Sequence, residues 1–154
     1  MEYRKASADD IELLMELRLG MLRTVNDLSG EYEFTAELIN NSREYFLKGD
    51  QTTVLALDDG KAEGCASISY FHVMPTFAHA AGKRAHIMNV YTLAGYRRRG
   101  IAKKLVTMLI DEAKEKGVSE IALDATISGR PLYEALGFRA SDEYMAMNIN
   151  SERT

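Results

Sequence analysis

The sequence predicts an α/β fold, a mixed β-sheet with helices packed on it, in the order β-α-α-β-β-β-α-β-α-β. Two observations support this prediction. Stretches with apolar residues at helical spacing separate shorter stretches in which apolar and polar residues alternate, as they do in strands. With 154 residues the chain has the length of one domain, so residues 1–150 are expected to form a single domain and residues 151–154 a frayed tail.

Caps and apolar spacing predict the helices. Ser7-x-x-Asp10 has the form of a capping box before the first helix, and Thr35 could cap the second. In the third helix apolar residues recur every four positions and Gly117 marks the stop, while Pro131 lies in the first turn of the last helix. In chain order, the helices are expected at about residues 8–25, 36–48, 101–116 and 130–136.

Alternating patterns and turn residues predict the strands. The Asp-Asp-Gly sequence at 58–60 supplies the turn of a hairpin, and Pro75 ends the strand that follows it. A mostly buried strand comes next, then a short one, and apolar residues at every second position near the C-terminus predict a final strand. In chain order, the strands are expected at about residues 2–6, 51–57, 66–74, 86–93, 121–123 and 145–149.

Composition excludes several classes of protein. Hydrophobic residues make up 46% and charged residues 27%, as in globular proteins with a packed core, which excludes a disordered chain. The net charge of -4 has the wrong sign for a protein that coats nucleic acid. Cys65 is the single cysteine, which favours a reducing, cytoplasmic location. No apolar run approaches the ~20 residues that span a bilayer, so no membrane partner is expected.

The segment at 97–102, Arg-Arg-Arg-Gly-Ile-Ala, lies between a strand and a helix. The start of a helix offers unpaired backbone N–H groups and a partial positive charge to an anion, and Gly100 and Ala102 are small enough for close approach. The same residues also suit a solvated basic turn. The segment lacks the P-loop and dinucleotide glycine patterns, and it has no interleaved aromatic residues for binding nucleic acid.

A second motif, Leu-Tyr-Glu-Ala-Leu-Gly-Phe at 132–138, follows further along the chain. Together with Tyr91-Thr92-Leu93-x-x-Tyr96-Arg97-x-x-Gly100-x-Ala102, in that order, it resembles the GNAT superfamily of N-acetyltransferases. The element order over essentially the whole chain is also similar to that fold. The resemblance implies a GNAT-like acyl-CoA N-acyltransferase fold. It also implies an enzyme that moves an acetyl group from acetyl-CoA to a primary amine by direct attack in a ternary complex.

The resemblance assigns roles to individual residues. The loop would hold the pyrophosphate of acetyl-CoA, and the preceding strand would pair with the pantetheine arm and polarise the thioester carbonyl through one N–H. Many family members have Asn where Thr126 stands and Gly where Ala102 stands, so a contact of Thr126 with the cofactor remains open. The expected cofactor-binding residues are Val90, Tyr91, Thr92, Arg97, Arg98, Arg99, Gly100, Ile101, Ala102, Lys103 and Thr126.

Tyr133 matches the general acid of the family. The chemistry supports this role, because the amine attacks a thioester, the oxyanion needs a fixed N–H donor, and the departing thiolate benefits from a proton. A tyrosine with a reference pKa of ~10, against ~8.5 for a thiol, is protonated at neutral pH and can donate that proton. A tyrosine that only packs the last helix is the alternative interpretation.

The group that deprotonates the substrate ammonium is weakly marked. Candidates on the substrate side are Asp124, Glu31 and Glu33, although Asp124 also suits a turn cap and the glutamates a solvated loop. The three histidines and the single cysteine match no metal-site spacing, so no metal is expected. Cys65 has no partners ordered as in a catalytic triad and is expected to be a small buried residue.

The acceptor side is expected to be built from the loop after the first helix and from residues 74–84. Asp27, Glu31 and Glu33 crowd that loop, which predicts a cationic acceptor such as a polyamine-like, aminoglycoside-like or lysine-type amine. A peptide or protein amino terminus is the competing acceptor, and a homodimer is compatible with the sequence. A rival from another class is a catalytically inactive acyl-CoA-binding sensor or docking module, against which Tyr133 argues.

Overall fold

The computed structural model describes residues 1–150, and the chain divides after Asp124 into two compact units. The predicted tail at 151–154 lies outside the described residues, and the single domain stays a prediction. The first unit contains β1 (Glu2–Lys5), a 3-10 turn (Ala8–Asp10), α1 (Ile11–Val25), α2 (Ala36–Lys48), β2 (Gln51–Asp58), β3 (Lys61–His72), β4 (Lys83–Thr92), a second 3-10 turn (Ala94–Tyr96), α3 (Ile101–Glu115) and β5 (Glu120–Leu123). The second contains α4 (Arg130–Ala135).

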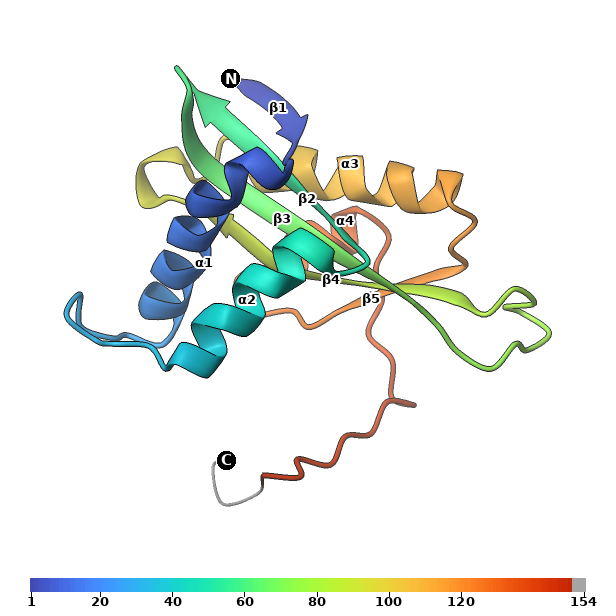
Figure 1. Ribbon diagram of the computed structural model, residues 1–154. Coiled ribbons are helices and arrows are strands. Elements are labelled where there is room, and N and C mark those ends of the chain that lie inside the picture. Colours follow the sequence, from blue (N-terminus) through green and yellow to red (C-terminus); the bar gives the residue numbers. More distant parts are fainter. Residues whose placement is uncertain (151–154) are drawn as a thin grey trace. The chain divides into compact units, whose positions relative to one another are not determined.

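The first unit is a five-stranded mixed sheet with helices on both faces. The strand order is β1-β2-β3-β4-β5, in which β5 runs parallel to β4 and all other neighbours are antiparallel. Helices α1 and α2 cover one face of the sheet, and α3 lies against the other (Figure 1). Because both faces are covered, Val54 and Leu55 are both buried although they point to opposite faces of β2.

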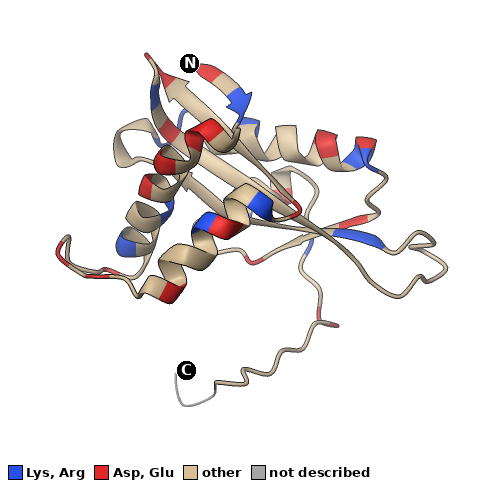
Figure 2. Cartoon of the chain, in the orientation of Figure 1, with Lys and Arg blue, Asp and Glu red and all other residues tan. Residues whose placement is uncertain are grey.

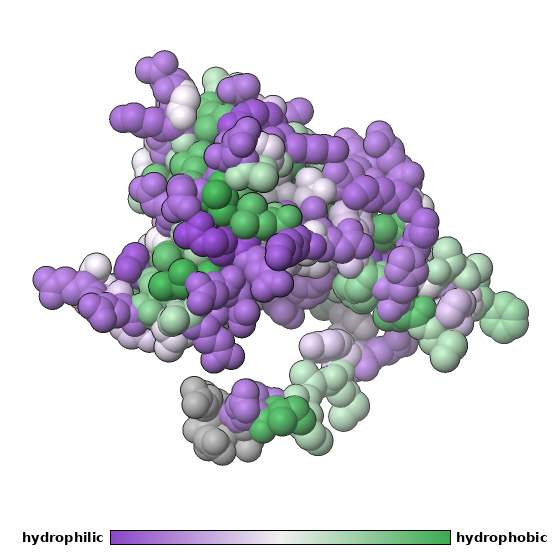
Figure 3. All heavy atoms as spheres, viewed as in Figure 1, coloured by the Kyte–Doolittle hydropathy of each residue, from purple (hydrophilic) through white to green (hydrophobic). Residues whose placement is uncertain are grey.

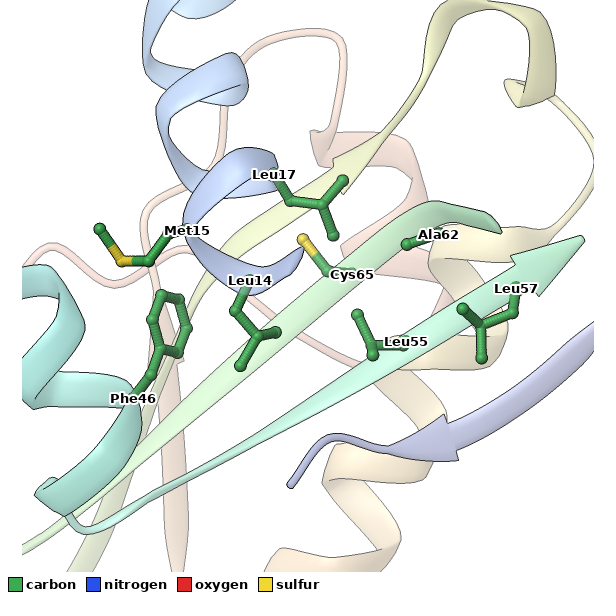
Figure 4. Packing of buried hydrophobic residues seen from close by; sticks show 8 residues of the cluster. All are labelled: Leu14, Met15, Leu17, Phe46, Leu55, Leu57, Ala62 and Cys65. Carbon is green, nitrogen blue, oxygen red and sulfur yellow. The ribbon is translucent and has the colours of Figure 1, made fainter. Parts of the chain in front are cut away.

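The core under α1 and α2 holds these helices on the sheet. Figure 4 shows apolar side chains from α1, α2, β2 and β3 converging in one cluster. Leu55 and Cys65 are fully buried at its centre. Burial of this kind contributes about 1.5–3 kcal/mol for each large apolar side chain. The members of the cluster are Leu14, Met15, Leu17, Phe46, Leu55, Leu57, Ala62 and Cys65.

Most predicted elements are confirmed, with small shifts at their ends. Ser7 N–H donates to the Asp10 carboxylate at 2.8 Å, and Thr35 Oγ1 accepts from Leu38 N at 3.2 Å, as expected of caps. The strand before Pro75 begins at Lys61 rather than near residue 66 and ends at His72 rather than near residue 74. The next strand begins at Lys83 rather than near residue 86. Among residues 1–150, no helix is long and apolar enough to cross a membrane.

The predicted final strand at 145–149 is wrong. Residues 139–150 contain no helix or strand, and Met145, Met147 and Ile149 are exposed. Alternation gives a segment one apolar face, but a strand also needs a neighbouring backbone to accept and donate its hydrogen bonds. Among the described residues, none of the backbone–backbone hydrogen bonds outside helices and strands involves this segment. The predicted last helix is confirmed as α4, and Gly137, with a φ of 101°, follows it as expected.

Candidate active site

A bulge in β4 shapes the middle of the sheet. Cys65 pairs with Tyr91 and Ser67 pairs with Met88, so two residue positions along β3 correspond to three along β4. Strand β4 therefore contains one extra residue at this point. Asn89 lies at this point with a φ of 60°, a conformation that Asn tolerates better than most residues. The bulge bends β4 and turns the Asn89 side chain into a buried position, where 7% of the residue is exposed.

Beyond the bulge β4 has an open edge in the first unit. The parallel pairing with β5 covers only Arg84 to Ile87, against Glu120 to Leu123. The predicted cofactor residues Val90, Tyr91 and Thr92 lie past the end of this pairing. Their strand therefore presents backbone that β5 does not cover, which is the condition for adding an extended ligand to a sheet edge.

The loop after β4 leads into an uncapped helix start. Arg97 Nε donates to the Thr92 carbonyl at 3.1 Å, and Arg98 and Gly100 both have positive φ, 63° and 77°. No side chain caps α3, and its first helical bond runs from Lys104 N to Gly100 O. The N–H groups of 101–103 consequently have no partner within the helix.

The same loop has room for a phosphate. A Cβ built on Gly100 would meet no atom within 4 Å, so open space lies beside the helix start. Arg99 stacks 5.0 Å above the ring of Tyr96, whose hydroxyl donates to Asp58 Oδ2 at 2.9 Å and ties the loop to the hairpin between β2 and β3. This bond raises the pKa of Tyr96 and keeps its proton in place. The donors and the space fit the pyrophosphate of acetyl-CoA.

A pocket that the sequence did not reveal lies among α1, α2 and the β4 bulge. Its volume is about 210 Å³. Arg18 reaches it from α1, and its Nη1 donates to Asn89 Oδ1 at 3.2 Å. A sequence signal existed, because Arg18 follows buried Leu14 by one helical turn, on the apolar side of α1. The pocket is lined by Arg18, Asn41, Ser42, Tyr45, Phe46, Met88 and Asn89.

Tyr133 lies on α4 in the second unit. Its ring is half-buried and makes an edge-to-face contact with Phe138, with ring centroids 5.9 Å apart. Burial raises the pKa of Tyr133, so the phenol is protonated at neutral pH. A Cβ on Gly129 would lie 3.1 Å from Thr126 Oγ1 and 3.3 Å from this ring, so the turn before α4 leaves little room for a side chain at that position.

Comparison with known proteins identifies the family. The family model for GNAT acetyltransferases matches residues 19–138. The chain belongs to this family. The acetyltransferase is 30% identical, over 97% of its length and 96% of the relative's, to a glucosamine 6-phosphate N-acetyltransferase of Trypanosoma brucei brucei. It therefore belongs among the acetyl-CoA-dependent N-acetyltransferases.

Solved structures agree with this assignment. A protein of Clostridium acetobutylicum that is described as a predicted acetyltransferase, and whose crystal structure contains acetyl-CoA, superimposes with a TM-score of 0.84 at 29% identity, covering 97% of each chain. A GCN5-related N-acetyltransferase of Ralstonia eutropha gives 0.79 at 27% identity, covering 97% of this chain and 98% of the other. The GNAT-like fold predicted from the sequence is thus confirmed.

Two other predicted site residues of the acetyltransferase, Thr126 and Asp124, have different surroundings. Thr126 Oγ1 accepts from Gly129 N at 3.1 Å, so its hydroxyl closes the turn before α4. Asp124 does not cap a turn. Its side chain is 92% exposed and lies 3.8 Å from His86 Nε2. The two residues keep their predicted roles only as hypotheses.

The acidic loop lies apart from the pocket lining. Residues 26–35 join α1 to α2, and Figure 2 shows their acidic positions in that loop. Glu31 and Glu33 are exposed, and neither lines the pocket around Arg18. The segment 74–84, also predicted to belong to the acceptor side, carries apolar side chains at its surface. Exposed Met74 and Phe77 lie at the tip of the hairpin between β3 and β4 (Figure 3).

Cys65 is excluded as a nucleophile. It is fully buried, its thiol donates to the Asn89 carbonyl at 3.4 Å, and burial raises its pKa to about 12. The thiolate, which is the reactive form, is therefore absent at neutral pH. This confirms the prediction of a small buried residue. Within residues 1–150, no three His, Cys, Asp or Glu side chains are grouped so that they could hold a metal ion.

Proposed function

We propose that this acetyltransferase moves the acetyl group of acetyl-CoA to a small primary amine by direct attack in a ternary complex. The observation that carries the proposal is the open edge of β4 that leads into the uncapped start of α3. Backbone of 90–92 would pair with the pantetheine arm, and one N–H there would stabilise the oxyanion. The N–H groups of 101–103 would bind the pyrophosphate, with Arg98, Arg99 and Lys103 supplying positive charge nearby.

Tyr133 would protonate the departing thiolate. Its role is supported by the motif that contains it and by the raised pKa, which keeps the phenol in its proton-donating form. A buried thiol at Cys65 offers no acyl-enzyme route, which favours direct transfer. Water or an exposed carboxylate such as Asp124 would accept the ammonium proton.

The name of a relative and the charge of the loop between α1 and α2 suggest which small amines to test as acceptors. The trypanosomal relative is named for glucosamine 6-phosphate, an anionic amino sugar. The acidic loop with Glu31 and Glu33 instead favours a cationic amine, which glucosamine, spermidine and lysine represent. Both classes therefore belong in one acceptor panel.

The test is thiol release from acetyl-CoA by the purified protein with this panel and a short peptide. We expect turnover with at least one amine, and double-reciprocal lines that intersect because both substrates must be bound together. Parallel lines would indicate a covalent intermediate and contradict direct attack. If acetyl-CoA binds by calorimetry but no amine releases thiol, the inactive acyl-CoA-binding module replaces this proposal.

A further inference from the structure

We propose that Arg18 recognises an anionic group, a carboxylate or a phosphate ester, on the amine acceptor. The inference rests on the proposed function and adds to it the chemical class of the acceptor and the residue that selects it. It runs against the cationic acceptor that the acidic loop suggests. Four observations carry it, and each concerns the pocket among α1, α2 and the β4 bulge.

Arg18 has no acidic partner among residues 1–150. Its guanidinium donates from Nη1 to Asn89 Oδ1 and, at 3.7 Å, to the sulfur of Met21. Three arginines of the chain, Arg4, Arg43 and Arg84, form ion pairs with Asp10, Glu12 and Glu120, and Arg18 is not among them. Arg18 is thus a charge in the described part of the chain that no carboxylate neutralises.

The lack of a partner is costly at this position. Arg18 is half-buried, and removal from water lowers its pKa, although a guanidinium keeps its proton at neutral pH. A desolvated charge without a counter-ion is unfavourable, and an apolar side chain of similar length would fill the same space without that cost. A ligand anion would supply the missing counter-charge.

Asn89 fixes the orientation of the guanidinium. The Asn89 amide donates to Ser67 Oγ at 3.3 Å, so its carbonyl oxygen is held toward Arg18. One guanidinium nitrogen is used in this way, while no hydrogen bond from Nε or Nη2 to residues 1–150 is present. Two adjacent free N–H groups form the fork that binds carboxylate and phosphate oxygens in pairs.

The pocket adjoins the place where the acetyl group would lie. Asn89 directly precedes Val90, which is the first of the three β4 residues that the family resemblance assigns to the pantetheine arm. The remaining lining is neutral, with Asn41 and Ser42 from α2 able to bond to hydroxyl groups of an acceptor. A volume of about 210 Å³ limits the occupant to a small molecule.

The first test compares matched acceptors with the unaltered protein. Glucosamine 6-phosphate is paired with glucosamine, and 4-aminobutyrate with 4-aminobutanamide. We expect the anionic member of at least one pair to have the higher kcat/KM, by roughly 10-fold or more, as a paired charge-assisted contact allows. The pair that shows the preference distinguishes phosphate from carboxylate. Equal or better turnover of both neutral members would overturn the inference while the proposed function stood.

The second test removes the charge. In Arg18→Met, KM for the preferred anionic acceptor should rise roughly 10- to 100-fold, whereas kcat/KM for its neutral partner and KM for acetyl-CoA should change little. Arg18→Lys should recover part of the loss. Arg43→Met, which removes an equal charge from α2 outside the pocket, is the matched control and should not change the acceptor preference.

A purely structural role for Arg18 gives a different pattern. If Arg18 only holds the bulge through Asn89, Arg18→Met will reduce turnover of the anionic and neutral acceptors by the same factor, and the inference is then wrong. Absence of thiol release with every amine, in the unaltered protein, would instead remove the proposed function itself. The two failures are therefore distinguishable.

Discussion

The starts of α2 and α3 differ in whether a side chain binds their free backbone N–H groups. At α2 the Thr35 hydroxyl accepts from Leu38 N and closes the helix. At α3 no side chain does so, and the chain enters through Gly100 in the left-handed region. A cap stabilises a helix by about 1 kcal/mol, so α3 lacks a stabilising contribution that is present at α2. Helices α1 and α4 also lack a side-chain cap, but only at α3 does the open start adjoin the free space beside Gly100 and a run of arginines, which suits an anionic ligand.

Tyrosine hydroxyls show the same contrast. The hydroxyl of Tyr45 is bonded to Ser69 Oγ at 2.7 Å and that of Tyr96 to Asp58 Oδ2 at 2.9 Å, so each has a partner within the fold. Within residues 125–150, no side chain or backbone group forms a hydrogen bond with the hydroxyl of Tyr133. Its proton is free for donation. The predictions below compare groups that are bonded with groups that are open.

The largest effect is expected for Gly100→Glu. The new carboxylate would occupy the space beside the α3 start and repel the pyrophosphate, so acetyl-CoA affinity should fall by roughly 1,000-fold, the equivalent of about two lost charge-assisted bonds. Gly60→Glu is the matched control, because Gly60 has a φ of 79° and equally open surroundings in the β2–β3 turn. Calorimetry should give similar stability for both variants and normal affinity only for Gly60→Glu. Normal affinity in the Gly100 variant would remove the loop from the cofactor site.

The next effect concerns catalysis. Tyr133→Phe keeps the contact with Phe138 and removes only the proton, so kcat should fall about 100-fold while acetyl-CoA affinity stays within about twofold. Tyr144→Phe, at a residue that is 77% exposed in the same unit, should leave kcat unchanged. Steady-state kinetics decide the matter, and an active Tyr133→Phe enzyme would make Tyr133 a packing residue.

A smaller effect is expected at the bonded start of the first helical segment. Arg4 donates to the Asp10 carboxylate and holds its pKa at about 2, below its ordinary 3.8. Because Arg4 is 37% exposed and partly screened, Asp10→Asn should lower the free energy of unfolding at pH 7 by between about 1 and 2 kcal/mol. A lowered pKa stabilises above the unfolded value, so this difference should disappear as the pH falls from about 4 to about 2. Urea titrations at several pH values measure it, with Asp9→Asn as the control, and a difference independent of pH would contradict the assignment.

The smallest effect is expected for Thr35→Ala. Loss of the cap should lower the free energy of unfolding by about 1 kcal/mol, with KM for acetyl-CoA unchanged. Denaturant titration and steady-state kinetics together check this. A reduced acetyl-CoA affinity in this variant would show that closed and open helix starts do not separate stability from binding.

Sequence reasoning succeeded where the interaction is local. The caps at Ser7 and Thr35, the turn at 58–60 and the stop at Gly117, whose φ is 76°, all depend on atoms a few residues apart. The same holds for the loop at 97–102, whose helix start is formed by consecutive residues. Such features are encoded in short segments, so their residue types alone predict them.

Only the tertiary structure decided the pocket proposed for the acceptor and the absence of a strand at residues 145–149. Arg18 and Asn89 are 71 positions apart, and nothing in the type of either residue predicts that they form a hydrogen bond. Residues 145–149 carry a strand pattern, yet pattern does not supply a partner. The β4 bulge likewise exists only relative to β3, because register is a property of two strands together. The sequence by itself determined the family fold and the loop proposed to bind acetyl-CoA, whereas long-range packing decided which charge faces the pocket.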